Sequence, residues 1–284
     1  STPTSYSVYG DVSLDYAVEK INSRINNPRL LQIVRTLEAD GMVENKLTSI
    51  IIPVYNEADY IISVLDKCCA LPMNKEIIVV DNNSTDNSYS LNKIHKTNRL
   101  QCNLPEMSSP GKANAIRYGL LHARGDYIVF QDADGEYDPT YIVQIVEELY
   151  HFSAVHGCRV CRPYSIGIGP FLANKILLSL VQNKFKIPIS DIFTGQRGYS
   201  RHVLEQFGIV SKGFEIETEL TMLVLNLGFM VKEIDVSYTP RNKSEGKKIS
   251  LADFFAIVFS YFLISHRLSR RRLGKTALAP TYWQ

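Results

Sequence analysis

The sequence predicts an α/β protein with one mostly parallel central sheet flanked by helices. Short runs rich in Val and Ile alternate with longer segments of helical periodicity, the pattern of a parallel α/β sheet. The first two strand-like runs, at 48–54 and 76–81, are largely apolar, as is typical of parallel strands buried on both faces. The chain has 284 residues, 45% of them hydrophobic, which is enough for one large domain. Its net charge of +2 gives no indication of a nucleic-acid partner.

Three segments are expected: an N-terminal helical extension at 1–47, the α/β domain at 48–249, and a C-terminal apolar and basic helix at 250–284. Apolar runs predict strands within the α/β domain at 48–54, 76–81, 99–103, 126–132, 154–160 and 230–238. Helical spacing and end signals predict helices at 58–71, 112–123, 140–150, 170–184 and 215–228, with a further helix after the polar loop that begins at residue 82. Residues 194–200 are short and rich in turn residues, so no element is assigned there.

Carboxylates follow three of the predicted strands at the point where each strand ends. Glu57 comes after the first, Asp81 ends the second, and Asp132 and Asp134 end the fourth. The carboxyl ends of parallel strands share one rim of the sheet, and ligands of open α/β sheets bind there. A single Asp in such a place is often only a helix cap. Three strand ends with the same chemistry indicate a ligand site.

Asp132 and Asp134 are the most informative pair. Two carboxylates so close repel each other unless a cation lies between them, and hard oxygen ligands suit Mg²⁺ or Mn²⁺. Glu136 is a candidate third ligand, directly or through water. Such a metal is usually completed by substrate phosphates, and the sequence contains no P-loop that would hold them instead. The alternative is an exposed acidic turn.

Four segments, IIPVYNE, VVDNNSTD, GKANAIRYGL and QDADGEYDP, resemble the ordered motifs of family-two glycosyltransferases with the GT-A fold. The resemblance covers about residues 48–245 and is greatest to the polyprenyl-phosphate sugar transferases, the dolichyl-phosphate mannosyl- and glucosyltransferase group. It implies a GT-A-type domain that moves a sugar from a UDP- or GDP-sugar to a polyprenyl phosphate, with Mg²⁺ or Mn²⁺ as cofactor.

The resemblance also implies roles for individual residues. Those that would hold the nucleotide are Pro53, Tyr55, Glu57, Asp81 (facing the base), Lys112 and Asp132. The implied metal ligands are Asp134 and Glu136, with Asp132 beside them. Basic residues that would bind the acceptor phosphate or the diphosphate are Arg159, with Arg162 as a competitor, Arg197, Arg241 and Lys243. Arginine forks and lysine charges are natural partners of phosphate oxygens, although the lysines of this basic loop can equally be solvated.

The implied reaction is a direct displacement with inversion, and the acceptor decides whether it needs a base. A hydroxyl acceptor needs one, for which Glu217 and Asp191 are the candidates beside Asp132 and Arg197 as catalytic residues. A phosphate acceptor is already anionic and needs none. For Glu217 the alternative is an acid on the solvent-facing side of an amphipathic helix. A nucleotidyltransferase, which would release pyrophosphate, also uses paired carboxylates and a metal, so this enzyme class stays open.

The C-terminal segment bears on the acceptor. Residues 251–265 are apolar over nearly the whole helix surface, and the basic stretch 266–275 follows at once. This is shorter than the roughly 20 residues that a spanning helix needs, but it suits a helix lying in the membrane interface. We therefore expect a cytoplasmic protein that is peripheral on the membrane. The alternative is a helix packed on the domain or on a second copy in a homo-oligomer.

Overall fold

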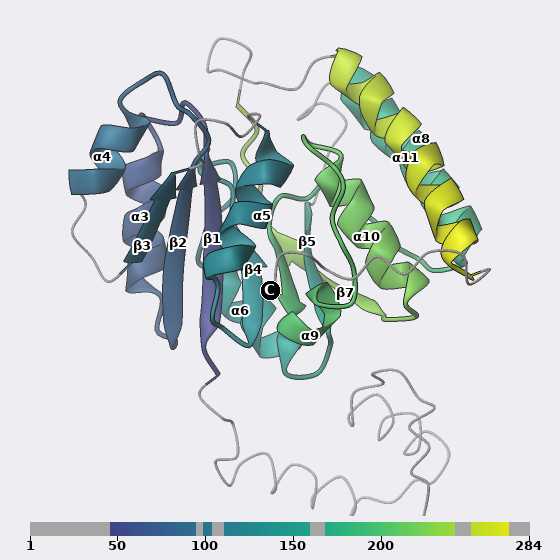
Figure 1. Cartoon of the computed structure of the whole chain (residues 1–284), viewed down its shortest axis with the longest axis horizontal. Coiled ribbons are helices and arrows are strands. Elements are labelled where there is room, and N and C mark those ends of the chain that lie inside the picture. Colours follow the sequence, from purple (N-terminus) through teal and green to yellow (C-terminus); the bar gives the residue numbers. More distant parts are fainter. Residues whose placement is uncertain (1–45, 95–98, 104–110, 160–167, 242–250, 273–284) are drawn as a thin grey trace, which may run out of the picture.

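The computed structural model describes residues 46–94, 99–103, 111–159, 168–241 and 251–272. Seven strands form one sheet in the order β3-β2-β1-β4-β6-β5-β7 (Figure 1). Their bounds are Thr48–Val54 (β1), Lys75–Asp81 (β2), Arg99–Asn103 (β3), Tyr127–Phe130 (β4), Ala154–Arg159 (β5), Arg197–Ser200 (β6) and Val231–Val236 (β7). All neighbouring pairs are parallel except those of β6, which runs antiparallel to both β4 and β5.

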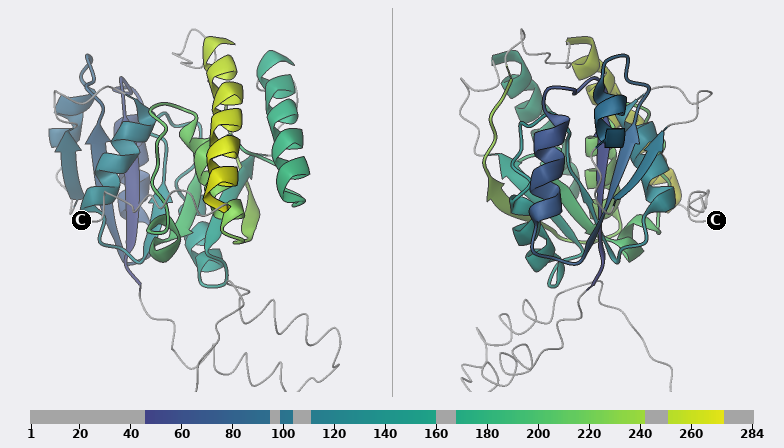
Figure 2. Two further views of the ribbon diagram at one scale, coloured as in Figure 1. Left: turned by 45° about the vertical axis from the view of Figure 1, so that its right-hand side comes forward. Right: turned by 90° about the vertical axis from the view of Figure 1, so that its left-hand side faces the viewer.

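Helices cover both faces of the sheet, which is why the central strands are apolar throughout (Figure 2). Their bounds are Ile61–Ala70 (α3), Ser88–Ile94 (α4), Lys112–His122 (α5), Tyr141–Leu149 (α6), Ile168–Phe185 (α8), Arg201–Leu204 (α9), Ile216–Asn226 (α10) and Leu251–Arg272 (α11). Successive residues of β1 point to opposite faces. Ile50 and Ile52 pack in one core with α3 and α6, whereas Ile51 packs in the other with α5 and α10.

The second half of the chain adds a layer outside the sheet. Helix α10 packs on the sheet side, and α8 and α11 lie side by side beyond it (Figure 2). The Tyr261 hydroxyl donates to the Leu180 carbonyl at 3.1 Å, and Lys184 Nζ donates to Ser265 Oγ at 2.8 Å, so both contacts join α11 to α8. No helix in the described part of the chain is both long and apolar enough to cross a membrane.

The expected α/β class is confirmed, as are all six predicted strands, with bounds shifted by a few residues at some ends. The predicted helices are confirmed with similar shifts. Strand β6 and the short helix α9 come from a segment to which we assigned no element. The expected extension at 1–47 lies outside the described residues except at its last two positions. Helix α11 forms within the expected C-terminal segment.

Candidate active site

The carboxyl ends of β1, β2 and β4 meet at one rim, as expected. The loops after β1 and β2 are tied together there by Asn56, whose side-chain Oδ1 accepts a hydrogen bond from the Thr85 backbone N–H at 2.8 Å. Asn56 has a positive φ of 53°, a conformation that Asn tolerates better than most residues. The next residue, Glu57, is buried, and its backbone N–H donates to Ser88 Oγ at 2.8 Å. These bonds fix the two loops as one wall of the rim.

Asp81 is buried at the end of β2 with one oxygen satisfied and one not. Its Oδ2 accepts from the Ser84 backbone N–H at 3.0 Å. Its Oδ1 is buried and has no hydrogen-bond partner among the residues that the structure describes. An unpaired buried carboxylate oxygen is costly, so this atom is suited to accept a hydrogen bond from a ligand.

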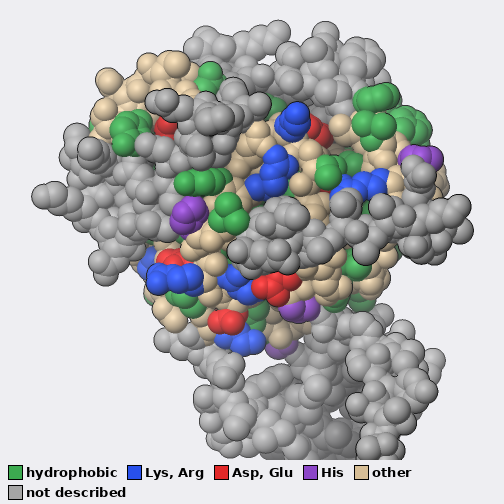
Figure 3. Space-filling view, viewed as in Figure 1, with side chains coloured by type: hydrophobic (Ala, Val, Ile, Leu, Met, Phe, Trp, Pro, Cys, Tyr) green, Lys and Arg blue, Asp and Glu red, His purple; other side chains and the backbone are tan. Residues whose placement is uncertain are grey.

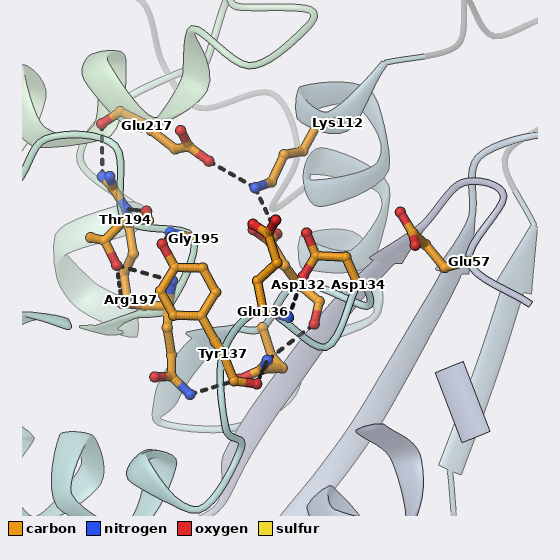
Figure 4. A network of polar contacts seen from close by, with 12 residues as sticks. Glu57, Lys112, Asp132, Asp134, Glu136, Tyr137, Thr194, Gly195, Arg197 and Glu217 are labelled. Carbon is orange, nitrogen blue, oxygen red and sulfur yellow. Dashed lines mark hydrogen bonds and ion pairs between the residues drawn. The ribbon is translucent and has the colours of Figure 1, made fainter. Parts of the chain in front are cut away.

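Lys112 forms the centre of the site. Its Nζ lies 2.6 Å from Asp132 Oδ1 and 2.7 Å from Glu217 Oε1, and so joins the end of β4 to the first turn of α10 (Figure 4). Burial alone would lower the pKa of Lys112, but the charges of Asp132 and Glu217 outweigh it and raise that pKa. Burial raises the pKa of Glu217, against the opposing effects of Lys112 and Arg197. The acid on α10 therefore does not face water, contrary to the solvent-facing alternative.

Gly195 allows Asp132 to sit where it does. A Cβ atom at position 195 would lie 1.9 Å from Asp132 Oδ2, far inside contact distance. The Gly195 backbone N–H donates to the hydroxyl of buried Tyr137 at 3.1 Å, which holds this loop against the loop after β4. A side chain at this position would push the Asp132 carboxylate off Lys112.

Asp134 and Glu136 lie on the other side of Asp132, and Arg241 faces both. Arg241 Nη2 lies 3.2 Å from Asp134 Oδ2, and the Arg241 backbone N–H donates to Glu136 Oε1 at 2.8 Å. The other Glu136 oxygen accepts from the Tyr238 hydroxyl at 2.7 Å. Burial and then the charges of Asp132 and Glu136 raise the pKa of Asp134 to about 7. This crowding of negative charge is what a bound cation would relieve.

The three expected metal ligands are not gathered into one group. No set of three or more His, Cys, Asp or Glu side chains within the described residues is placed to hold a metal ion. Asp132 points to Lys112, and Asp134 lies beside it (Figure 4). Glu136 is held by the Tyr238 hydroxyl and the Arg241 backbone N–H. The donor chemistry of Asp132 and Asp134 suits Mg²⁺ or Mn²⁺. Glu136 fits less well, since both of its oxygens are already engaged.

The expectation that Arg197 binds a phosphate is wrong for this structure. Its side chain is 1% exposed, and its guanidinium donates to the carbonyls of Thr194, Glu217 and Ile192 and to the Thr221 hydroxyl. These bonds use the donors of the fork within the protein. Arg197 therefore supports the Gly195 loop and the start of α10 from beneath the site.

Arg159 and Asp191 turn out to be partners. Arg159 Nε and Nη2 donate to the two Asp191 oxygens at 2.6 and 2.8 Å, and the guanidinium also stacks on the Tyr238 ring. Asp191 additionally accepts the Phe193 backbone N–H at 3.1 Å. An Asp so engaged is a poor general base, which leaves Glu217 as the better candidate. Arg162 and Lys243 lie outside the described residues.

The remaining expected residues line the rim. Pro53 is partly buried within β1, and the ring of Tyr55 is 41% exposed next to it. Sequence reasoning missed the supporting aromatic residues Tyr60, Tyr137 and Tyr238. The signals for Tyr137 and Tyr238 were their places inside the family-like segments DGEYDP and VSYTP, whereas Tyr60 had none.

The site and fold define a class: an α/β enzyme with an acidic rim suited to phosphorylated ligands. The model of "Glycosyl transferase family 2" matches residues 49–208, more than half of the chain, so the chain belongs to this family. It is a glycosyltransferase, which decides against the nucleotidyltransferase alternative.

Two relatives with similar sequences are also named as glycosyltransferases. An uncharacterised glycosyltransferase of Mycobacterium tuberculosis is 28% identical over 222 residues, which cover 74% of this chain and 97% of the relative. The dolichyl-phosphate beta-glucosyltransferase of Saccharomyces cerevisiae is 26% identical over 239 residues, 74% of this chain and 71% of that one.

Among solved structures, the glucosyl-3-phosphoglycerate synthase of Mycobacterium tuberculosis with phosphoglyceric acid has a TM-score of 0.63 and 20% identity, covering 78% of this chain and 80% of that chain. The same enzyme with Mn²⁺ and UDP-glucose has a TM-score of 0.61 and 22% identity, covering 77% and 78%. The GT-A fold expected from the resemblance is therefore confirmed.

Proposed function

We propose that the protein is a metal-dependent inverting glycosyltransferase that moves a sugar from a UDP- or GDP-sugar to a polyprenyl phosphate at a membrane surface. One observation carries the proposal: carboxylates from the ends of the two strands that flank β1, Asp81 of β2 and Asp132 with Asp134 after β4, line the same rim. They include an oxygen without a partner among the described residues and a carboxyl with a raised pKa.

Asp81 is the proposed nucleobase contact. Uracil and guanine both present a ring N–H, which can donate to the buried Asp81 Oδ1 that has no partner in the described residues. The exposed Tyr55 ring is available to stack on the base. Both contacts fit UDP and GDP alike. The solved neighbour crystallised with UDP-glucose supports a donor of this class.

Asp132 and Asp134 are the proposed ligands of Mg²⁺ or Mn²⁺, with Glu136 acting through water. A divalent ion bound there would stabilise the negative charge of the departing diphosphate. Lys112 contributes a second positive charge from the α5 side of Asp132, and Arg241 a third from beyond β7. A site prearranged to stabilise the leaving group lowers the barrier for transfer.

The proposed chemistry is a single displacement. An anionic oxygen of the acceptor phosphate attacks the anomeric carbon, the bond from that carbon to the diphosphate oxygen breaks, and the nucleoside diphosphate leaves with the bonding electrons. The configuration inverts because attack and departure occur on opposite faces. No protein base is required, because the phosphate is already ionised.

The lipid acceptor is supported by the yeast relative, named for dolichyl phosphate, and by one exposed apolar surface. Ile176 on α8 and Phe259, Phe262 and Leu263 on α11 are 45–63% exposed, and they are called the α8/α11 apolar surface below. Figure 3 shows hydrophobic side chains gathered over these two helices. An apolar helix face with a basic flank suits binding to the membrane interface, so we place the protein peripherally on the cytoplasmic side.

A hydroxyl acceptor is the second candidate, and Glu217 favours it. Its carboxyl is buried beside Lys112 and has a raised pKa, as a general base near neutral pH should. The structural neighbour named for glucosyl-3-phosphoglycerate supports an acceptor of this kind.

Radiolabelled UDP- and GDP-sugars with Mn²⁺ or Mg²⁺, offered with polyprenyl phosphate or with 3-phosphoglycerate, test the proposal. We expect a lipid-soluble labelled product and release of a nucleoside diphosphate. Asp134→Asn should remove activity at any acceptor. Glu217→Gln distinguishes the two candidates, since it should retain transfer to phosphate if no base is needed and lose transfer to a hydroxyl. A labelled product only with the water-soluble acceptor would contradict the lipid proposal.

A further inference from the structure

We infer that Arg241 is a built-in counter-ion that competes with the divalent metal, so that the metal binds well only together with the nucleotide. This inference rests on the proposed function, because it assigns Asp134 to the metal. It concerns the order and coupling of binding at that site, not the identity of the sugar or acceptor.

Arg241 is enclosed by acidic side chains. Its Nη1 lies 2.8 Å from Glu57 Oε2 and its Nη2 lies 3.2 Å from Asp134 Oδ2. Its guanidinium lies over the Tyr60 ring, 5.2 Å from the ring centroid. The side chain is 11% exposed, so the cation is held inside the rim and is not a solvated surface charge. One guanidinium thereby bridges the loop after β1 and the loop after β4.

The same oxygen cannot serve both cations well. A metal ligand places Mg²⁺ about 2.1 Å from a carboxylate oxygen. An ion that close to Asp134 Oδ2 would lie within a few ångströms of Arg241 Nη2, and the two positive charges would repel at short range with little water between them. The other oxygen, Asp134 Oδ1, already accepts the Glu136 backbone N–H at 3.0 Å. Metal binding at Oδ2 therefore requires the guanidinium to leave Asp134.

The backbone at Arg241 stays anchored when the side chain moves. The Arg241 N–H is bonded to Glu136, and the Thr239 N–H donates to the Glu136 carbonyl at 2.9 Å. A change of side-chain rotamer is thus sufficient to release Asp134 and Glu57. A diphosphate arriving with the metal offers Arg241 a new anionic partner of equal quality, which offsets the loss of the carboxylates. Only the diphosphate of the nucleotide can replace the carboxylates as the partner of Arg241, and a metal ion without nucleotide supplies no such anion.

Mn²⁺ titration followed by electron paramagnetic resonance of the free ion tests this directly. The measurements use the full chain alone and with UDP or GDP, without any sugar transfer. Arg241→Gln should bind Mn²⁺ at least tenfold more tightly than the unmodified protein when nucleotide is absent. The tightening of Mn²⁺ binding by UDP or GDP should shrink in the same variant. Lys232→Gln, which removes one positive charge from β7 away from the rim, should leave both values unchanged.

Arg241→Met is the second variant, and it decides the matter if Arg241→Gln does not fold. It removes the charge but keeps an unbranched apolar side chain that can cover the Tyr60 ring, and Mn²⁺ binding without nucleotide should tighten as in Arg241→Gln. Unchanged or weaker Mn²⁺ binding in the folded Arg241→Gln protein overturns the inference. If Asp134→Asn still abolishes Mn²⁺ binding in that case, the metal site of the proposed function stands without it.

Discussion

At the scale of single residues, Gly195 and Asp132 depend on each other. Because a Cβ at position 195 would overlap Asp132 Oδ2, Gly195→Ala should displace the carboxylate from Lys112. We expect a loss of initial transfer rate of 10²-fold or more, since a misplacement of about 1 Å at reacting groups can have that effect. Gly228→Ala is the control: its φ of +90° makes the substitution strained, but nothing lies within 4 Å, so stability should fall and the rate should not.

His156 makes stability depend on pH. It is fully buried, its Nδ1 has no partner among the described residues, and burial followed by the charge of Arg197 holds its pKa well below 6.5. The folded state therefore favours the neutral ring. Its contribution is fully present above the unfolded pKa of about 6.5 and is lost as the pH falls below that value.

We expect the free energy of unfolding to fall by about 1 kcal/mol between pH 6.5 and pH 5.5 from this residue alone. Urea unfolding at both values measures it. His156→Gln should flatten the dependence, whereas the same change at exposed His151 should not. An identical slope in the His156 variant would assign the pH dependence to other groups.

Which residues carry charge could be predicted from the sequence, but where their side chains point could not. Asp81, Asp132 and Lys112 lie at the rim because strand ends fix their position. Arg197 follows the same kind of turn-rich segment as a phosphate-binding arginine, yet its guanidinium donates to carbonyls of the preceding loop and of the first turn of α10. For Glu217, a candidate base, the alternating acids of its helix left a solvent-facing position open, and it is buried because α10 is covered on all sides.

At the scale of elements, the central parallel strands β1, β2 and β4 were predictable because each contains a continuous apolar run. Strand β6 was not, since four residues between turn signals carry no period, and its pairing with β4 and β5 comes from tertiary contact. The burial of α10 has the same origin. Helices α8 and α11 cover the outer side of α10, so its Thr and Glu side chains are buried as well. Their positions in the sequence therefore do not mark a solvent-facing side of the helix.

Helix α11 is fastened to α10 by one buried ion pair. Glu219 is fully buried, accepts the N–H groups of Val210 and Ser211, and lies 3.3 Å from Arg267 Nη1. Arg267→Gln leaves that carboxylate without its cation, which should lower the free energy of unfolding by about 2–3 kcal/mol.

Chemical unfolding monitored by circular dichroism checks this value. Lys184→Gln is the matched control, because it also removes a contact to α11 but leaves no buried charge, and about 1 kcal/mol or less is expected. Equal losses in the two variants would show that the buried charge of Glu219 is not what makes Arg267 important.

At the scale of the whole molecule, the α8/α11 apolar surface should direct the protein to lipid. The double substitution Phe259→Ser and Leu263→Ser removes two side chains that are 63% and 55% exposed. Co-sedimentation with vesicles containing anionic lipid should fall at least tenfold, because interfacial binding scales with buried apolar area. Leu121→Ser, which removes a similarly exposed side chain from α5, should have no effect.

The competing explanation is a second copy of the chain on that surface. Sedimentation velocity without lipid separates the two: a dimer that dissociates in the double variant, together with unchanged vesicle binding, would assign the surface to self-association.

The reversed direction of β6 has a consequence for how the enzyme can change. Arg197 at the start of β6 lies opposite Phe130 at the end of β4, so the second half of the chain reaches the rim directly before β6 begins. The part of the connection into β6 that lies ahead of Asp191 can change in length without shifting the register of β1, β2 or β4, whereas Gly195 must stay beside Asp132. The half that would hold the nucleotide and the half that would receive the acceptor thus meet where β4 pairs with β6. A change of acceptor can be accommodated in the second half while the first half stays the same.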